Sequence, residues 1–187
     1  MDLSIPLAIA AGIALSAACG LRAFLPLLAV SGAARLHYIP LAPGAAWLAD
    51  DRVLIALSVA TVIEILADKI PVVDHAMDAI ATLIRPVAAA VGAYALLQPL
   101  ASPWDAILAL IFGGGALVVH AAKAKTRLGS TAFTLGVANP FLSFLEDGLA
   151  FAISAAAILL PIVALAGIVG LFFLTRAIFR RRAPARA

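Results

Sequence analysis

Charged side chains that lie within or beside long apolar runs are the residues of this sequence that could do chemistry. In the segment EILADKIPVVDHAMDAIATLIRP, Glu64 and Asp68 are four residues apart, and Asp74 and Asp78 repeat that spacing. A helix would place both carboxylates of each pair on one face. Two carboxylates held close in a poorly polar medium raise the pKa of one of them, which suits a proton carrier. An ion-paired corner between helices is the alternative interpretation.

A second polar stripe follows the step Asn139–Pro140 in the string TLGVANPFLSFLEDGLAF. Asn139, Ser143 and Asp147 are spaced by four residues, and Glu146 lies beside them. A helix would therefore align an amide, a hydroxyl and a carboxylate. Such a stripe along a proline-broken membrane helix could line a hydrated path. The alternative is a helix N-terminus whose acids interact favourably with the helix dipole.

Basic residues stand near these acids and could neutralise them: Arg22, Lys69, Arg85, Lys123, Lys125 and Arg127. A charged side chain at the centre of a bilayer costs roughly 2.5–3.5 kcal/mol on insertion scales, so we expect mutual pairing. Arg22 follows a charge-free run and precedes Pro26. An arginine beside a broken helix can clamp a carboxylate or a phosphate, and snorkelling to the interface is the alternative.

A third set lies in the string HAAKAKTRLGST, where helical spacing aligns His120, Lys123 and Arg127 and leaves Lys125 off that face. The pattern is typical of a solvated basic rim or of a site for a lipid headgroup phosphate.

A metal site is a minor hypothesis. Its candidate ligands are Asp74, His75 and Asp78, with His120 or Glu146 from elsewhere in the chain. No HExxH spacing occurs, and the single cysteine, Cys19, excludes a cysteine pair. Because no nucleophile elbow, phosphate-binding glycine loop or dinucleotide fingerprint is present, we expect neither an enzyme nor a cofactor.

The elements that must position these residues follow from the composition. The 187 residues are 65% hydrophobic and 12% charged, with a mean hydropathy of +1.13, whereas soluble domains carry about 25% charged residues. A soluble enzyme, a disordered chain, collagen and a disulfide scaffold are therefore excluded. The net charge of +3 does not indicate nucleic-acid binding. A basic tail typical of a cytoplasmic anchor beside anionic lipid contains Arg176, Arg180, Arg181, Arg182 and Arg186.

The apolar runs predict an all-α, polytopic transmembrane helix bundle of about six spans. The runs are Leu3–Leu21 (continuing past Arg22 to about Gly32), Val53–Ile63, Pro86–Trp104, Ala106–Val119, Leu128–Leu145 and Gly148–Thr175. We expect broken or re-entrant helices near Pro71–Pro86 and Asn139–Pro140, and a kink at Pro161. If 128–145 re-enters, the spans number five.

With six spans, both termini and most of the basic connections between spans lie in the cytoplasm, and Arg35 and Arg52 lie outside. Residues 1–179 then form one transmembrane domain, and 180–187 form the basic cytoplasmic tail. Small residues at spacing four predict close helix packing along the first span: Ala8, Gly12, Ser16 and Gly20.

Four ordered strings, GLRAFLPLL, DKIPVVDHAMDAIATLIRP, VHAAKAKTR and ANPFLSFLED, resemble the signature blocks of a bacterial membrane-protein family, domain of unknown function 4126. The resemblance covers about Pro6 to Pro161 and departs from the family pattern at Thr134–Leu135–Gly136. It implies a helical protein of the bacterial inner membrane, and it carries over no activity and no catalytic residue.

A weak internal repeat is present, because a polar residue precedes an X–Pro step by 21 residues from Glu64 to Arg85 and by 19 residues from His120 to Asn139. Together with acid pairs and broken helices, it favours a transporter or channel for a small ion or solute. Glu64 and Asp68 would carry protons or cations, Asp147 and Asn139 would line the path, and Arg22 and Arg85 would pair with the acids in one state. A carrier or scramblase of a phosphate-bearing lipid is the first alternative, and a structural membrane scaffold is the second. The expected partners are membrane lipids, the transported solute and, as a homo-oligomer, a second copy of the chain.

Overall fold

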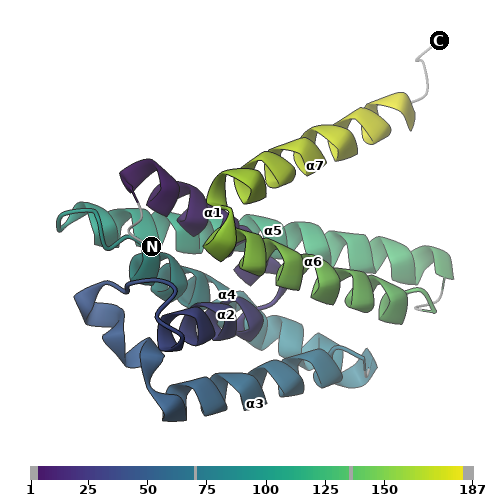
Figure 1. Ribbon diagram of the computed structural model, residues 1–187. Helices are drawn as coiled ribbons and strands as arrows, with labels where there is room; N and C mark the ends of the chain where they lie inside the picture. Colours follow the sequence, from purple (N-terminus) through teal and green to yellow (C-terminus); the bar gives the residue numbers. More distant parts are fainter. Residues whose placement is uncertain (1–3, 70, 135–136, 183–187) are drawn as a thin grey trace.

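The computed structural model describes residues 4–69, 71–134 and 137–182, with the backbone alone at 71–79, 175 and 177–182. Every regular element in these ranges is a helix, which confirms the all-α prediction. The elements are α1 (Ile5–Leu21), α2 (Phe24–Arg35), the 3-10 helix η1 (Pro43–Ala49), α3 (Asp51–Ala67), α4 (Pro71–Leu96), α5 (Trp104–Thr134), α6 (Asn139–Leu159) and α7 (Pro161–Arg182) (Figure 1).

The α-helices of the described chain alternate in direction between two ends of one bundle (Figure 1). At one end, Ala8 of α1 packs with Leu97 and Ala109. At the other end, which we call the polar end, Arg22 meets charged residues of α3 and α6. Helix α7 begins beside the start of α1 and runs toward the polar end, so the two ends of the described chain lie at opposite ends of the bundle (Figure 1).

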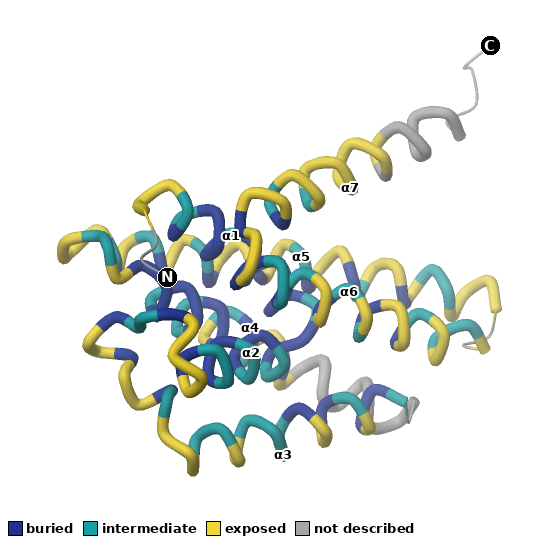
Figure 2. The backbone as a smooth tube through the Cα atoms, viewed as in Figure 1, coloured by how far each residue is buried: buried dark blue, intermediate teal, exposed yellow. Residues whose placement is uncertain are grey.

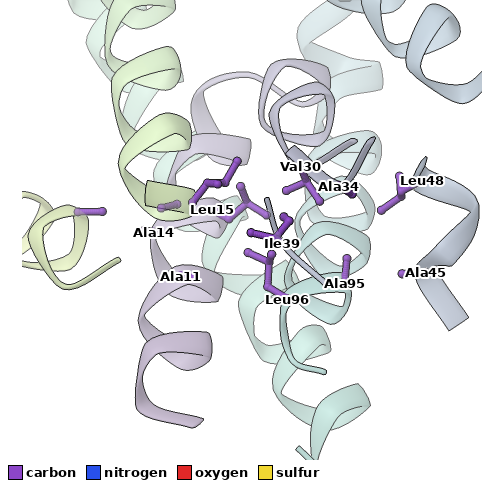
Figure 3. Packing of buried hydrophobic residues seen from close by; sticks show 13 residues of the cluster. Ala11, Ala14, Leu15, Val30, Ala34, Ile39, Ala45, Leu48, Ala95 and Leu96 are labelled. Atoms are coloured by element: carbon purple, nitrogen blue, oxygen red, sulfur yellow. The ribbon is translucent and has the colours of Figure 1, made fainter. Parts of the chain in front are cut away.

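Helix α1 is the central element, because it packs against α4, α5, α6 and α7. The stripe of small residues predicted on it is buried, which confirms the packing prediction. A Cβ on Gly12 would lie 2.7 Å from the Phe112 ring, and one on Gly20 would lie 2.5 Å from the Cβ of Val119. Only glycine permits this approach of α1 to α5. Leu15, the neighbour of Ser16 on α1, packs in an apolar cluster with residues of α2 and α4 (Figure 3).

The first apolar run is two helices, not one. Helix α1 ends because Arg22 adopts an extended backbone, with φ −139° and ψ 127°, and the chain then reverses into α2. Pro26, expected to break the helix, instead lies in the first turn of α2. A proline is tolerated there because the N–H it lacks would have no partner within the helix.

The predicted span Leu128–Leu145 is wrong, because it contains the end of α5 and the start of α6. A charge-free run does not require a continuous helix, and Pro140 at the start of α6 fits a helix beginning. Pro161 likewise begins α7 instead of kinking a longer helix. Helix α4 passes through Pro86 without ending, contrary to the break expected there.

Large apolar side chains face outward from the bundle. The exposed fractions are 72% for Val118, 75% for Phe141 and 65% for Phe151, and Figure 2 shows α7 exposed along most of its described length. Among the described residues, α5 and α6 are long and apolar enough to cross a membrane. Extensive exposed apolar surface of this kind is typical of contact with lipid or with another protein.

Candidate functional site: a buried ion-pair network

Arg22 is the centre of the polar end, and its side chain is fully buried. Its Nη1 lies 2.5 Å from Oδ2 of Asp68, and its Nη2 lies 2.6 Å from Oδ1 of Asp147. Nη2 also donates a hydrogen bond to Oγ of Ser143 at 3.0 Å. One guanidinium therefore joins the end of α1 to α6 and to the end of α3. The side chain points inward, as the clamp hypothesis expects, and does not snorkel.

Asp68 is the most shared acid of the network. It is the residue that ends α3, and its Oδ2 also lies 2.9 Å from Nη2 of Arg127 and 3.2 Å from Nζ of Lys123. Together with Arg22, three cations thus converge on one carboxylate oxygen. This arrangement offsets the large cost of burying each charge separately.

Glu146 provides the second acceptor for the two α5 cations. Its Oε2 lies 2.8 Å from Nη2 of Arg127 and 3.1 Å from Nζ of Lys123. Arg127 Nε also donates to Oε1 at 3.3 Å. The predicted alignment of the α5 cations is confirmed, because His120, Lys123 and Arg127 are all buried whereas Lys125 is exposed.

Glu64 makes different contacts from those that its spacing suggested. Its two carboxylate oxygens accept hydrogen bonds from the backbone N–H groups of Ala23, at 2.8 Å, and Phe24, at 3.1 Å. These N–H groups lie at the start of α2 and have no partner within that helix. The Glu64 carboxylate, which belongs to α3, therefore caps the N-terminus of α2. Glu64 and Asp68 therefore bind separate partners instead of forming the expected like-charge pair.

Lys69 and Asp147 form the most accessible edge of the network. Their side chains pair at 3.0 Å with exposed fractions of 23% and 17%, against 0% for Arg22. The ammonium of Lys69 also lies 4.3 Å from the centre of the Phe144 ring, a favourable cation–π geometry. Water or a solute would meet this pair before it met Arg22.

A second polar group adjoins the network on α4 and α5. Arg85 donates hydrogen bonds to the carbonyl of Gly20, at 3.2 Å, and to Nδ1 of His120. Arginine has only donors, so Nδ1 must be the unprotonated acceptor. The proton of a neutral His120 then sits on Nε2, which lies 3.1 Å from Oγ1 of Thr82.

Several predicted residues lie outside this network. Asn139 donates a hydrogen bond to Oγ1 of Thr131 at 2.9 Å, and this contact links α5 to α6. The side chains of Asp74, His75 and Asp78 lie outside the described residues. Among the side chains that are described, no group of three or more His, Cys, Asp or Glu could hold a metal ion.

The expected neutralisation of charges is confirmed within the described network. Its cations are Arg22, Lys69, Lys123 and Arg127, and its acids are Glu64, Asp68, Glu146 and Asp147. Sequence reasoning missed Thr82 and the backbone donors of Ala23 and Phe24. Pro26 carried a signal for the latter, because a proline in a first turn marks a helix that begins just before it.

In the part of the chain that the structure describes, fold and site together define an all-helical protein whose bundle holds a buried network of ion pairs. The family model described as Domain of unknown function (DUF4126) matches residues 9–181. The chain therefore belongs to this family, as its signature strings indicated. No curated protein and no solved structure matches the chain.

Proposed function

We propose that this chain is a membrane-embedded transporter or channel for a small ion or solute, and that its buried ion-pair network is the part that opens. The observation that carries the proposal is the convergence of Arg22, Lys123 and Arg127 on Asp68 inside an apolar bundle. Charges inside a membrane bundle are costly, and they commonly mark ion or solute pathways. In a purely structural scaffold, apolar residues would stabilise the bundle as well as these buried charges do.

The length of α5 sets the depth of the network. At 1.5 Å per residue, His120 lies about 24 Å and Arg127 about 35 Å along the helix from Trp104. The hydrocarbon core of a bilayer is about 30 Å thick, and tryptophan favours its boundary. With Trp104 at one interface, the network lies near the other interface, where the edge formed by Lys69 and Asp147 can meet water.

Basic residues favour a cytoplasmic polar end. Lys125 and Arg127 belong to this end, and the exposed Arg176 lies on the part of α7 that runs toward it. The opposite end holds the exposed pair Arg35 and Asp51, 2.5 Å apart. By the positive-inside rule the polar end faces the cytoplasm. Under this proposal the alternation of the helices puts the start of α1 outside, whereas the charge-free runs predict that both termini are cytoplasmic.

The packing of α3 suggests how the network opens. This helix contacts chiefly α2 and η1, and one face of it is exposed, including Ile55, Val59 and Val62. Asp68 and Lys69 tie its end to α1, α5 and α6. Separation of these ion pairs would free the end of α3 and open a polar route between α3 and α6. Solute binding that favours the separated state would shift the population toward it.

Flux through reconstituted vesicles tests this proposal. The purified chain is placed in liposomes, and uptake of protons, sodium, potassium, chloride and phosphate is followed with dyes or isotopes. We expect Asp68→Asn to abolish the flux that the native chain supports, because without this carboxylate the network cannot return to its paired state and the cycle between the paired and separated states stops. Asp51→Asn, which removes one exposed carboxylate at the opposite end, is the matched control and should retain the flux.

Normal flux through a folded Asp68→Asn protein would contradict a role for the network in transport. Absence of flux for every solute with the native chain would favour the scaffold instead.

A groove beside the network favours the lipid carrier as a second candidate. This apolar cavity of about 400 Å³ lies between α2, η1 and α4 and is lined in part by Phe24, Trp47 and Val87. Phe24 also donates its backbone N–H to Glu64, so the groove adjoins the network. An acyl chain could lie in it. Transbilayer movement of a fluorescent phospholipid in the same liposomes, with no solute flux, would select this candidate.

A further inference from the structure

We infer that Arg22, Lys123 and Arg127 form a binding site for a phosphate oxyanion, and that Asp68 occupies this site in the resting state. The inference rests on the proposed function and names its substrate class. Oxyanion recognition by convergent arginines is well suited to phosphate, because a guanidinium presents several N–H donors in a plane.

The first argument is the geometry of the cations. Arg22 Nη1, Arg127 Nη2 and Lys123 Nζ lie 2.5, 2.9 and 3.2 Å from the same oxygen, Oδ2 of Asp68. Three donors around one oxygen form a cradle for an anion with more acceptor atoms than a carboxylate offers. A phosphate group presents its oxygens in several directions and could satisfy the same three donors separately.

The second argument is an unused donor. Nε of Arg22 is buried and has no hydrogen-bond partner among the described residues, although the whole side chain is inaccessible to solvent. A buried donor left unpaired costs about 1–3 kcal/mol. The Nε–H of a guanidinium lies on the edge shared with Nη2, so a bound anion could use this donor if it also took the place of Asp147 on Nη2.

The third argument is charge. Removal of Asp68 from the network leaves Arg22, Lys69, Lys123 and Arg127 against Glu64, Glu146 and Asp147. Because the buried Arg85 also lies near Lys123, the described residues then carry an excess of positive charge, which a phosphate oxyanion would offset. A metal cation would increase the excess and is disfavoured.

The position of Asp68 allows it to leave. It ends α3, and only a short connection separates it from the start of α4 at Pro71. Its neighbour Lys69 lies at the accessible edge, 23% exposed, beside Asp147. An incoming anion would meet Lys69 first and then replace Asp68 on the three cations.

Calorimetric titration of the purified full-length chain with inorganic phosphate, at ionic strength held constant with chloride, tests the inference. We expect Asp68→Asn to bind phosphate at least about tenfold more tightly than the native chain, because a site open in about one molecule in ten loses affinity by that factor. Asp51→Asn removes the same charge at the opposite end and should bind as the native chain does. Adding Arg127→Gln to Asp68→Asn should abolish binding.

Equal phosphate affinity in folded Asp68→Asn and Asp51→Asn would overturn the inference. Should Asp68→Asn fail to fold, thermal unfolding of the native chain decides: phosphate should raise the unfolding temperature above that in chloride of equal ionic strength. No rise would overturn the inference. Solute flux without phosphate binding would refute this inference alone, and phosphate binding without any flux would refute the proposed function alone.

Native mass spectrometry of protein released gently from its membrane separates the two sources of the phosphate group. Retained phospholipid that is lost in Val87→Trp, which fills the apolar groove, identifies a lipid headgroup as the ligand. Phosphate binding that Val87→Trp leaves unchanged, with no retained lipid, identifies free phosphate. Either result supports the oxyanion site. The inference also requires that Arg127→Gln abolish the binding of phosphate and of phospholipid.

Discussion

Arg22 shows how one side chain can decide the stability of the polar end. It is fully buried, and both of its Nη atoms pair with carboxylates, Asp68 at 2.5 Å and Asp147 at 2.6 Å. Replacement by an uncharged residue would leave both acids buried with less compensation. Breaking a buried ion pair by removing one partner costs about 3–5 kcal/mol, far more than the pair itself contributes relative to apolar residues.

We therefore expect Arg22→Gln to lower the unfolding temperature strongly in detergent, with a loss of about 3–5 kcal/mol in the free energy of unfolding. The measurement is thermal unfolding followed by circular dichroism. Arg35→Gln is the matched control, because Arg35 pairs with Asp51 at the exposed end of α2 and should leave the unfolding temperature nearly unchanged. Similar unfolding temperatures for the two variants would contradict the central role of Arg22.

At this scale the sequence predicted that acids and bases near the apolar runs pair, but not which acid meets which base. The matched acids and bases near the apolar runs indicated mutual neutralisation, because buried charges require partners. The spacing of Glu64 and Asp68 suggested one shared site, yet Glu64 caps α2 through the N–H groups of Ala23 and Phe24. Backbone donors do not appear in a pattern of side chains. Their partner becomes visible only when two helices distant in the sequence are placed together.

Among the elements, α4 and α5 lie in close contact where glycine removes a side chain. A Cβ on Gly113 would lie 2.7 Å from the carbonyl oxygen of Pro86, whereas one on Gly114 would meet nothing within 4 Å. The two glycines are adjacent in the sequence and identical in type. They differ in the helix face on which they lie.

We expect Gly113→Ala to destabilise the protein by about 1–3 kcal/mol, because the methyl group must push two backbones apart. Gly114→Ala should leave stability unchanged or raise it by up to about 1 kcal/mol, since alanine favours a helix more than glycine does. Chemical denaturation of both variants in the same detergent measures the difference. Destabilisation of the same size in both would mean that the α4–α5 contact is not as close as described here.

Helix ends were harder to predict than helices. Apolar runs located most of the helical material, because long stretches without charge favour helices in a membrane. The runs did not mark where helices stop, since Arg22 ends α1 within one apolar run and Pro161 begins α7 within another. A proline in the sequence can indicate either a break within a helix or the first turn of a new helix. Which of the two occurs depends on the neighbouring groups that cap the new helix.

At the scale of the whole molecule, the directions of the helices predict how the chain would be oriented across a membrane. The α-helices of the described chain alternate in direction, so the start of α1 and the end of α7 lie at opposite ends of the bundle (Figure 1). Counting charge-free runs placed both termini on one side instead. That count treated Leu128–Leu145 as a span and merged α1 with α2 and α6 with α7. The side of a membrane on which each terminus lies stays a prediction.

Cysteine labelling from one side of the membrane distinguishes these arrangements. Cys19 is fully buried and should give little background. With a membrane-impermeant maleimide on intact cells, we expect Ser4→Cys and Tyr38→Cys to react, because both positions are exposed away from the polar end. Lys125→Cys, exposed at the polar end, should react only after the membrane is opened. Protection of Ser4→Cys together with Lys125→Cys in intact cells would restore a cytoplasmic N-terminus and contradict the alternating arrangement.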